Sequence, residues 1–469
     1  MRAGGSIRRG GMLVAAAALL IAGCAPAITR RAPPETPASF ESGAPHAPAP
    51  TWPGREWYRG FSSGQLDELV QQASARNGDL AQARARVAQA DARARIAGAP
   101  ILPSVDAQGD AAYLAGRSSS GSGHETDWSA LLSASYEIDF WGKNRAALRS
   151  AASLRSAAKA EREAVALTLL AAVADGYFQV LALEQRMSIA KSNLETAQHV
   201  LSVVKARFDA GAAGPIELAS QKAALDAAAL AISDLAQRGE EARAALALLV
   251  GRVPEGFALR TETLDALTEP RVAPGLPADL LVRRPDVFLA ESSLAAADAD
   301  VAVARAAMLP GVTLTAAGGV QNPALNAAVL ALPGAGPTLA LGGSLTQSIF
   351  DHGRLEAQRR EAQAKSEELL AAYHGAILAA LADTENALAA LRHLDEARPY
   401  QSEALTESEH AFEGAKLRYQ AGSGDYLTLL EAQRSLYGVR DQSVQYRLAR
   451  LEALVALCKA LGGGWTEPT

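Results

Sequence analysis

The stretch RYQAGSGDY at residues 418–426 decides the fold, because the stretch RFDAGAAGP at residues 207–215 repeats its beginning. In both, an arginine and an aromatic residue come shortly before an Ala-Gly pair, and the two stretches stand about 211 residues apart. Each ends an alanine-rich run of about 65 residues with at most one proline, a composition that favours an α-helix. A second alanine-rich run follows each Ala-Gly pair. The chain is therefore predicted to contain two long helical hairpins.

The two hairpins belong to a larger internal repeat. LPSV at 102–105 matches LPGV at 309–312 with an offset of about 207 residues, and two further pairs have an offset of about 211. These pairs are WGK at 141–143 with HGR at 352–354, and LVG at 249–251 with ALG at 460–462. A nearly constant offset over such a length indicates duplication.

Each copy is predicted to have the same order of elements. A helix comes first, over 64–98 in the first copy and 286–308 in the second, and a proline ends it. Two strand-like segments, a very long helix, the Ala-Gly turn and a second long helix follow. The predicted parts of the chain are 1–23, 24–60, a first repeat over 61–255, a linker over 256–280, a second repeat over 281–464 and a tail over 465–469.

The strand-like segments alternate between apolar and small polar residues, with the period of two that marks a β-strand. Their apolar positions are Val105, Ala107, Gly109, Ala111 and Tyr113; Trp128, Ala130, Leu132, Ala134, Tyr136 and Ile138; Val312, Leu314, Ala316, Gly318 and Val320; and Leu339, Leu341, Gly343 and Leu345. Small polar residues between them suit the water-filled lumen of a membrane barrel, and about 9–12 residues is the length that a tilted strand needs. Trp128 and Tyr136 are expected near the membrane interfaces.

The long helices are predicted to form coiled coils. Leu370, Ile377, Leu381, Leu388 and Leu391 step by seven, four, seven and three residues, which makes a narrow apolar seam. Ala164–Leu183 is apolar enough for a hydropathy scan to choose it, but its place inside a longer polar-faced helix favours a soluble segment. Cys458 continues an apolar stripe and is expected to be a core residue.

The N-terminus reads as a targeting segment. Two arginines precede an apolar run of about 11 residues, which suits a signal peptide over 1–23 and is too short to span a bilayer. The run ends in Ile21-Ala22-Gly23-Cys24, which resembles a bacterial lipobox and implies a lipid on Cys24. Ala25 follows, so the resemblance points to the outer membrane. The proline-rich residues 24–60 are predicted to be an extended tether.

Charge and motif content disfavour several other functions. The formal net charge is −6, and it becomes −9 without the three arginines of residues 1–23, which argues against nucleic-acid binding. The seven histidines show no metal-ligand spacing, and no Walker or dinucleotide glycine motif occurs. The chain is predicted to be no enzyme and to hold no cofactor besides the lipid on Cys24.

Four strands are too few to close a barrel. An open sheet edge in lipid leaves unpaired backbone groups that cost several kcal/mol each. The subunit must therefore share its edges with copies of itself. Two copies give eight strands and three give twelve, and these counts alone do not choose between them.

Three segments resemble the NodT/OprM group of TolC-type outer-membrane efflux lipoproteins. They are GLPADLLVRRPDV at 275–287, ARAAMLP at 304–310, and RYQAG at 418–422 with DYLTLLEAQR at 425–434. The chain departs from that group's pattern at Ala278-Asp279, which puts little in doubt, and at Gly214-Pro215 in the first turn. The resemblance covers roughly 57–464. It implies an α+β membrane protein: a trimeric 12-strand β-barrel with four strands per subunit, continuous with a 12-helix periplasmic barrel of long coiled-coil helices.

The same resemblance implies a function and partners. The chain is expected to be the exit duct of a tripartite efflux pump in the outer membrane, bound as a homotrimer to a periplasmic adaptor and an inner-membrane transporter of the RND class. A TolC-like duct for type I protein secretion is the alternative within the family. A structural coiled-coil lipoprotein is the alternative outside it, and the alternating strands disfavour that one.

By the same resemblance, the two hairpin turns carry the functional residues. Residues matching the family's periplasmic gate and its bracing partners are Asp425, Leu427, Glu431, Arg434, Tyr419 and, in the first copy, Glu217. A ring of carboxylates from three subunits attracts cations and disfavours anions. Residues matching the adaptor-contact surface are Gly211, Ala212, Gly422 and Ser423.

Overall fold

A computed structural model of the chain describes residues 37–41, 51–118, 121–260, 262–273, 275, 277–321 and 338–466. All of them belong to one unit that spans Thr36–Thr469. The predicted signal peptide, Cys24 and most of the tether lie outside the described residues. Lipidation of Cys24 therefore stays a prediction.

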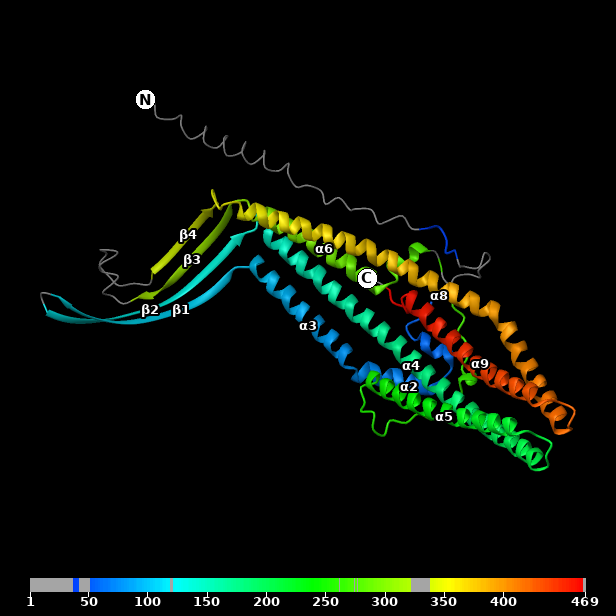
Figure 1. The fold of residues 1–469 in the computed structure, drawn as a ribbon. Coiled ribbons are helices and arrows are strands. Elements are labelled where there is room, and N and C mark those ends of the chain that lie inside the picture. The colour runs from blue at the N-terminus through cyan, green and yellow to red at the C-terminus, as the bar shows by residue number, and fades with distance from the viewer. Residues whose placement is uncertain are drawn as a thin grey trace, which may run out of the picture. The chain divides into compact units, whose positions relative to one another are not determined.

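Four antiparallel strands form one sheet in the order β1-β2-β3-β4 (Figure 1). They are β1 (Ser104–Ser118), β2 (Gly121–Ile138), β3 (Gly311–Gln321) and β4 (Thr338–Thr346). The two strands predicted in each copy are confirmed, although β1 has 15 residues and β2 has 18, more than expected. β2 pairs with β3, so the sheet joins the two copies.

The register places the apolar residues of all four strands on one face. Ala107 lies opposite Leu132, Leu132 opposite Gly318, and Gly318 opposite Leu339. Because successive side chains point to opposite faces, the serines, threonines and acids between them share the other face. Leu132 is 60% exposed and Leu339 is 76% exposed in the single chain. One apolar and one polar face suit lipid on one side of the sheet and water on the other.

Both edges of this sheet are open in the single chain. Among the described residues, β1 pairs only with β2 and β4 pairs only with β3. The folded subunit therefore needs further copies to close the barrel, as its strand number predicts.

The long helices run almost without interruption. Within the described residues the helices are α2 (Gly64–Arg76), α3 (Gly78–Gly98), α4 (Lys143–Asp209), α5 (Pro215–Leu249), α6 (Pro285–Ala306), α8 (Arg354–Gln420) and α9 (Tyr426–Ala460), with 3-10 turns η1 (Trp57–Phe61), η2 (Ala99–Ile101), η3 (Leu264–Ala266) and η4 (Pro277–Val282). α4 and α8 have 67 residues each, and α8 continues through Pro399. In Figure 1 the sheet lies at one end of the long helices and both hairpin turns lie at the other.

The single helix predicted over 64–98 is two helices, so that expectation was wrong. Asn77 between them has an extended backbone, with φ −63° and ψ 132°, and its side chain accepts hydrogen bonds from the N–H groups of Asp79 and Leu80. An asparagine that satisfies the first free N–H groups of a helix competes with continuation of the helix before it. Because of this break, α3 alone is the helix of the first copy that corresponds to α6 in the second.

Asn77 and Arg284 occupy equivalent places in the two copies. Asn77 Nδ2 donates to the backbone oxygen of Leu249 at the end of α5, and Arg284 Nη1 donates to that of Ala460 at the end of α9. The turn after α5 contains Gly251 and the turn after α9 contains Gly462, and both glycines have positive φ. The duplication read from the sequence therefore extends to the tertiary contacts.

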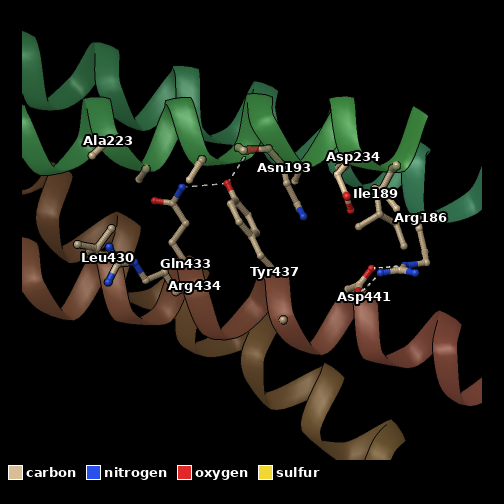
Figure 2. Close-up of a pocket in the computed structure, with 17 residues that line it drawn as sticks. Arg186, Ile189, Asn193, Ala223, Asp234, Leu430, Gln433, Arg434, Tyr437 and Asp441 are labelled. Atoms are coloured by element: carbon tan, nitrogen blue, oxygen red, sulfur yellow. Dashed lines mark hydrogen bonds and ion pairs between the residues drawn. The ribbon is translucent and has the colours of Figure 1, made fainter. Parts of the chain in front are cut away.

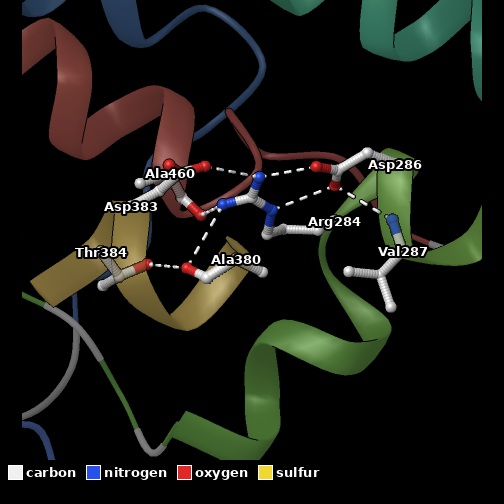
Figure 3. A network of polar contacts seen from close by, with 7 residues as sticks. All are labelled: Arg284, Asp286, Val287, Ala380, Asp383, Thr384 and Ala460. Atoms are coloured by element: carbon white, nitrogen blue, oxygen red, sulfur yellow. Dashed lines mark hydrogen bonds and ion pairs between the residues drawn. The ribbon is translucent and has the colours of Figure 1, made fainter. Parts of the chain in front are cut away.

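The Arg284 guanidinium connects three elements at this junction (Figure 3). It is 8% exposed and lies 2.6 Å from Asp286 and 3.0 Å from Asp383. It also donates to the backbone oxygens of Ala380 and Ala460. The planar fork of an arginine can serve all of these acceptors at once, so the start of α6, the middle of α8 and the end of α9 are held together.

The main apolar core gathers residues from η1, α2, α4, α5 and α9. Phe61, Tyr177, Leu246 and Leu451 are fully buried there. Cys458 is also fully buried, and burial raises the pKa of its thiol to about 12, as expected of a core residue.

Among the described residues, α4 is long and apolar enough to cross a membrane by length and composition. Of its most apolar 18-residue window, 44% is buried inside the protein. Val173, Tyr177 and Leu181 lie in the main core, so burial within the protein accounts for this part of the predicted soluble segment Ala164–Leu183.

Candidate functional site

The candidate site is the tip, defined as the two hairpin turns at 210–214 and 421–425. Gly211 has φ +73° and Gly422 has φ +76°, a conformation that glycine adopts without steric cost at the end of a helix. The N–H of Ala212 donates to Arg207 O at 2.7 Å, and the N–H of Ser423 donates to Arg418 O at 3.0 Å. All four predicted adaptor-contact residues are exposed at these turns.

Both helices that leave the two turns are capped at their first residues. Gly214 is the N-cap of α5 and Pro215 its first residue, while Glu217 Oε1 accepts a hydrogen bond from the N–H of Gly214. Asp425 caps α9, because its carboxylate accepts from the N–H of Thr428 at 2.9 Å. This hydrogen bond lowers the pKa of Asp425, so the group stays ionised.

Tyr419 binds the two copies together at the tip. Its side chain is 1% exposed, and its phenol donates a hydrogen bond to Glu217 Oε2 at 2.9 Å. Burial, followed by the neighbouring Glu217 carboxylate, raises the pKa of Tyr419 to about 12, so the phenol keeps the proton that it donates. The structure therefore brings together two of the predicted gate residues.

Arg207 completes this contact from α4. Its guanidinium carbon lies 4.5 Å from the centre of the Tyr419 ring, and its Nη1 donates to the backbone oxygen of Tyr419. A cation over the ring, a hydrogen bond to the backbone and the bond to Glu217 fix Tyr419 in one place.

A second contact lies one turn further from the tip. Tyr426 OH lies 3.1 Å from Gln221 Oε1, and Gln221 Nε2 donates to the backbone oxygen of Ala197. The rings of Tyr419 and Tyr426 meet edge to face at 6.0 Å between centroids. Val204, Phe412, Leu429 and Leu436 form an apolar cluster beneath these rings.

Leu427, Glu431 and Arg434 stand apart from this buried network. They follow one another at spacings of four and three residues and therefore share one stripe of α9. All three are exposed, with Leu427 at 61%. Among the described residues of the single subunit, Arg434 forms no ion pair, so its role as a bracing partner of the gate stays a prediction.

Several residues of the contact between the two copies were missed by sequence reasoning. Arg207 belongs to the repeated motif, RFDAG at 207–211, yet the sequence predicted no functional role for it. Arg186 pairs with Asp441 at 2.6 Å, and Tyr437 OH donates to the backbone oxygen of Asn193 at 2.6 Å (Figure 2). The available signal was the repeated Arg-aromatic pair; nothing in the sequence pattern pairs Arg186 with Asp441.

The subunit has two long helical hairpins. At one end lies a sheet with one apolar and one polar face, and at the other end hydrogen bonds hold the two turns together. These features define a subunit of an outer-membrane channel. The profile of the family described as outer membrane efflux protein matches residues 69–252 and 276–463. The chain belongs to this family, as the resemblance of its motifs predicts.

Relatives and solved structures agree with this assignment. The chain is 43% identical over 420 residues to the pyoverdine export outer membrane protein OpmQ of Pseudomonas aeruginosa, with 88% of each chain covered. The structure of the outer-membrane channel OprN has a TM-score of 0.85 at 29% identity, with 93% of this chain and 98% of that chain covered. The open state of the MtrE outer-membrane channel of Neisseria gonorrhoeae has a TM-score of 0.81 at 30% identity, with the same coverage.

The chain is accordingly the outer-membrane channel of a tripartite efflux pump, and it extends from the outer membrane into the periplasm. It has the α+β fold class of the trimeric channels that it resembles, in which subunit sheets close a common barrel and the long helices continue it. This family transports molecules, and such channels work with a periplasmic adaptor and an inner-membrane transporter.

Proposed function

We propose that the α8–α9 turn closes the periplasmic mouth of a homotrimeric duct at rest. The observation that carries this proposal is the hydrogen bond between Tyr419 and Glu217 with Arg207 over the Tyr419 ring. It holds the second hairpin against the first at the tip, where a duct must close. Outward movement of the second hairpin has to break it.

The exposed stripe of α9 supplies the constriction in this proposal. Leu427 and Glu431 lie one turn apart on a face that the subunit itself leaves uncovered. Three copies of Leu427 form an apolar ring and three copies of Glu431 an acidic ring, with Asp425 at the tip beside them. Such rings limit the passage of solutes and favour cations over anions.

Conductance in planar lipid bilayers tests the gate. The double variant Leu427→Ala with Glu431→Ala is expected to raise the conductance of the resting channel several-fold and to reduce its preference for cations. Leu417→Ala is the matched control, since Leu417 is an equally exposed leucine of α8 near the same tip (62%). Conductance of the double variant at the wild-type level rejects the assignment.

The tip glycines and their neighbours are proposed to receive the adaptor. Gly211, Ala212, Gly422 and Ser423 present small side chains, which permit close approach of another backbone. Cysteines placed at Ala212 and Ser423 should crosslink to the adaptor, and a cysteine at the exposed Ser402 of α8 should not. Crosslinking that is equal at all three positions contradicts this surface.

The inner-membrane partner is proposed to be a transporter of the RND class, on the strength of the NodT/OprM-like segments. Crosslinked complexes purified through the channel identify it by mass spectrometry. If only transporters of other classes are recovered, this part of the proposal is overturned.

The cargo is proposed to be pyoverdine or a chemically related secreted metabolite, because OpmQ exports pyoverdine and is 43% identical to this chain. Expression in Pseudomonas aeruginosa that lacks OpmQ should restore pyoverdine in the medium. OpmQ itself and the empty plasmid are the upper and lower references. Export at the empty-plasmid level by a channel that reaches the outer membrane and conducts in bilayers rejects this cargo.

A further inference from the structure

A groove with a volume of about 510 Å³ lies between α8 and α9 in the second hairpin. Among the described residues no charged side chain lines it, whereas three glutamines do: Gln401 of α8, and Gln442 and Gln445 of α9. Gln442 and Gln445 are exposed, so a ligand can reach both amides from solvent. The groove is therefore an open, uncharged surface with hydrogen-bonding groups, and its volume lies in the range of small-molecule sites, which is about 300–1000 Å³.

The groove lies on the same side of α9 as the proposed gate. Gln445 follows Leu427 by 18 residues, and Ala449, which also lines the groove, follows Glu431 by 18 residues. Eighteen residues are five turns of an α-helix, so both pairs share one stripe of α9, about 27 Å apart along its axis. The inference rests on the proposed function: a stripe that carries the constriction faces the lumen, and the groove then opens into the lumen on the membrane side of that constriction.

The subunit leaves most of the hydrogen-bonding groups of the groove unused. The Gln442 amide has no hydrogen-bond partner among the described residues. Gln445 Nε2 donates to Asp441 Oδ2 at 2.5 Å, and Gln445 Oε1 remains available as an acceptor. Tyr446, which also lines the groove, donates its only phenol proton to the backbone oxygen of Leu394, so its phenol oxygen can accept from a ligand. The groove thus offers one amide donor group and several acceptors.

These groups match the backbone of a peptide. A peptide group complements a glutamine amide, because each has an N–H donor and a C=O acceptor. Side chains three residues apart on a helix, such as Gln442 and Gln445, have Cβ atoms about 5–6 Å apart. Two residues of an extended peptide cover about 6.6 Å, so both glutamines can pair with one peptide chain at groups two residues apart. A lining without charge favours an uncharged ligand, because no ion has to lose its water when the ligand binds.

We propose that this groove binds uncharged, polar peptide segments of the cargo as they pass through the lumen. The Gln442 amide pairs with one peptide group of the segment, and Gln445 Oε1 and the Tyr446 phenol oxygen accept hydrogen bonds from further N–H groups. Each of these exposed hydrogen bonds contributes only about 0.5–1.5 kcal/mol. The cargo is therefore held weakly enough to move on, as conduction through a duct requires.

The test titrates the purified full-length channel in nanodiscs with N-acetyl-Ser-Gly-Ser-Gly amide, an uncharged polar peptide, and follows binding by saturation-transfer NMR. Saturable binding is expected. The same peptide with methylated backbone nitrogens has lost its N–H donors and should bind about tenfold more weakly. Maltotriose, which offers hydroxyl groups but no peptide group, should also bind more weakly. Absence of saturable binding by the first peptide, or equal affinity for it and either comparison compound, overturns the proposal.

Protein variants locate the site. The double variant Gln442→Ala with Gln445→Ala should bind the peptide about tenfold more weakly than the wild type. Gln358→Ala is the matched control, because it removes an exposed glutamine of α8 that does not line the groove. Helical content by circular dichroism shows that each variant is folded. Equal affinity of the double variant and the control for the peptide overturns the assignment to this groove.

Cysteine modification in planar bilayers separates this inference from the proposed function. A methanethiosulfonate reagent added from the extracellular side should lower the conductance of Gln445→Cys and Leu427→Cys channels. The wild type should not respond, because Cys458 is fully buried. If neither variant responds, the stripe of α9 does not face the lumen, and the proposed gate falls together with this inference. If Leu427→Cys responds and Gln445→Cys does not, only this inference is overturned.

Discussion

The phenol of Tyr419 lies 2.9 Å from Glu217 Oε2, although 202 residues separate them in the chain. The bond joins the last turn of α8 to the first turn of α5. It joins the two copies of the repeat near the tip, together with the Arg207 guanidinium that covers the same ring. Loss of this hydrogen bond loosens the tip without touching the barrel or the main apolar core.

Tyr419→Phe should open the tip part of the time. The variant keeps the ring beneath Arg207 but leaves the half-buried Glu217 carboxylate without its phenol donor, at a cost of about 1–2 kcal/mol. Single-channel recordings in planar bilayers should show more frequent openings than in the wild type. Tyr400→Phe changes an exposed tyrosine of the same helix, 74% exposed, and should behave as wild type. Identical recordings from both variants contradict a bracing role for the phenol.

Arg284→Met should destabilise the junction of α6, α8 and α9 by about 2–4 kcal/mol. The substitution leaves Asp286 and Asp383 without their shared cation and the terminal oxygen of α9 without its donor. Thermal unfolding followed by circular dichroism measures the loss. Arg360→Met is the control. Arg360 is 74% exposed and forms a surface ion pair with Glu356, so its replacement should change the unfolding midpoint little. Arg284→Lys should not restore stability, because an ammonium cannot serve four acceptors in one plane.

Asp175→Asn should make the channel more stable at neutral pH. Burial and the nearby Glu452 raise the pKa of Asp175 to about 7, and its Oδ1 has no hydrogen-bond partner among the described residues. The folded protein therefore holds this proton at a pH where the unfolded chain, with an ordinary pKa of about 3.9, has released it. Stability from this group is complete below about pH 4 and is lost as the pH rises towards 7.

The comparison of unfolding midpoints at pH 5 and pH 7.5 checks the sign. The wild type should lose stability between these values relative to Asp175→Asn, by an amount on the order of 2 kcal/mol. Glu396→Gln changes an exposed carboxylate and is the control. A pH dependence that is the same in Asp175→Asn and the wild type rules out Asp175 as its source.

Gly462→Ala should cost far more stability than Gly256→Ala. Both glycines have positive φ, +84° and +73°, so both substitutions carry the same backbone strain. A Cβ on Gly462 would lie 1.9 Å from the backbone oxygen of Arg283, whereas one on Gly256 meets nothing within 4 Å. The first variant must therefore separate the end of α9 from residues 283–284. Equal unfolding midpoints for the two variants would show that this close approach is not required.

Local patterns in the sequence were sufficient for the elements and for the repeat. Period-two alternation placed the strands, and the register then put Ala107, Leu132, Gly318 and Leu339 on one face. The length of α4 followed from its lack of proline, whereas α8 is equally long although it contains Pro399, and the turns followed from Gly211 and Gly422. The break at Asn77 was missed because a capping asparagine inside an alanine-rich segment looks like any polar surface residue until its side chain bonds to Asp79 and Leu80.

The sequence by itself determined that this chain is a duplicated subunit with too few strands to close a barrel alone. The period of the apolar residues, the proline content and the length of each segment depend on residues that are close in the chain, so they can be read directly from the sequence. Only the tertiary structure decided which side chains hold the copies together. Arg207 meets Tyr419 and Arg186 meets Asp441 across more than 200 residues. Such pairs depend on how two long helices pack side by side. The sequence of one helix alone does not determine which of its faces meets the other helix, or how far the two are shifted along their axes.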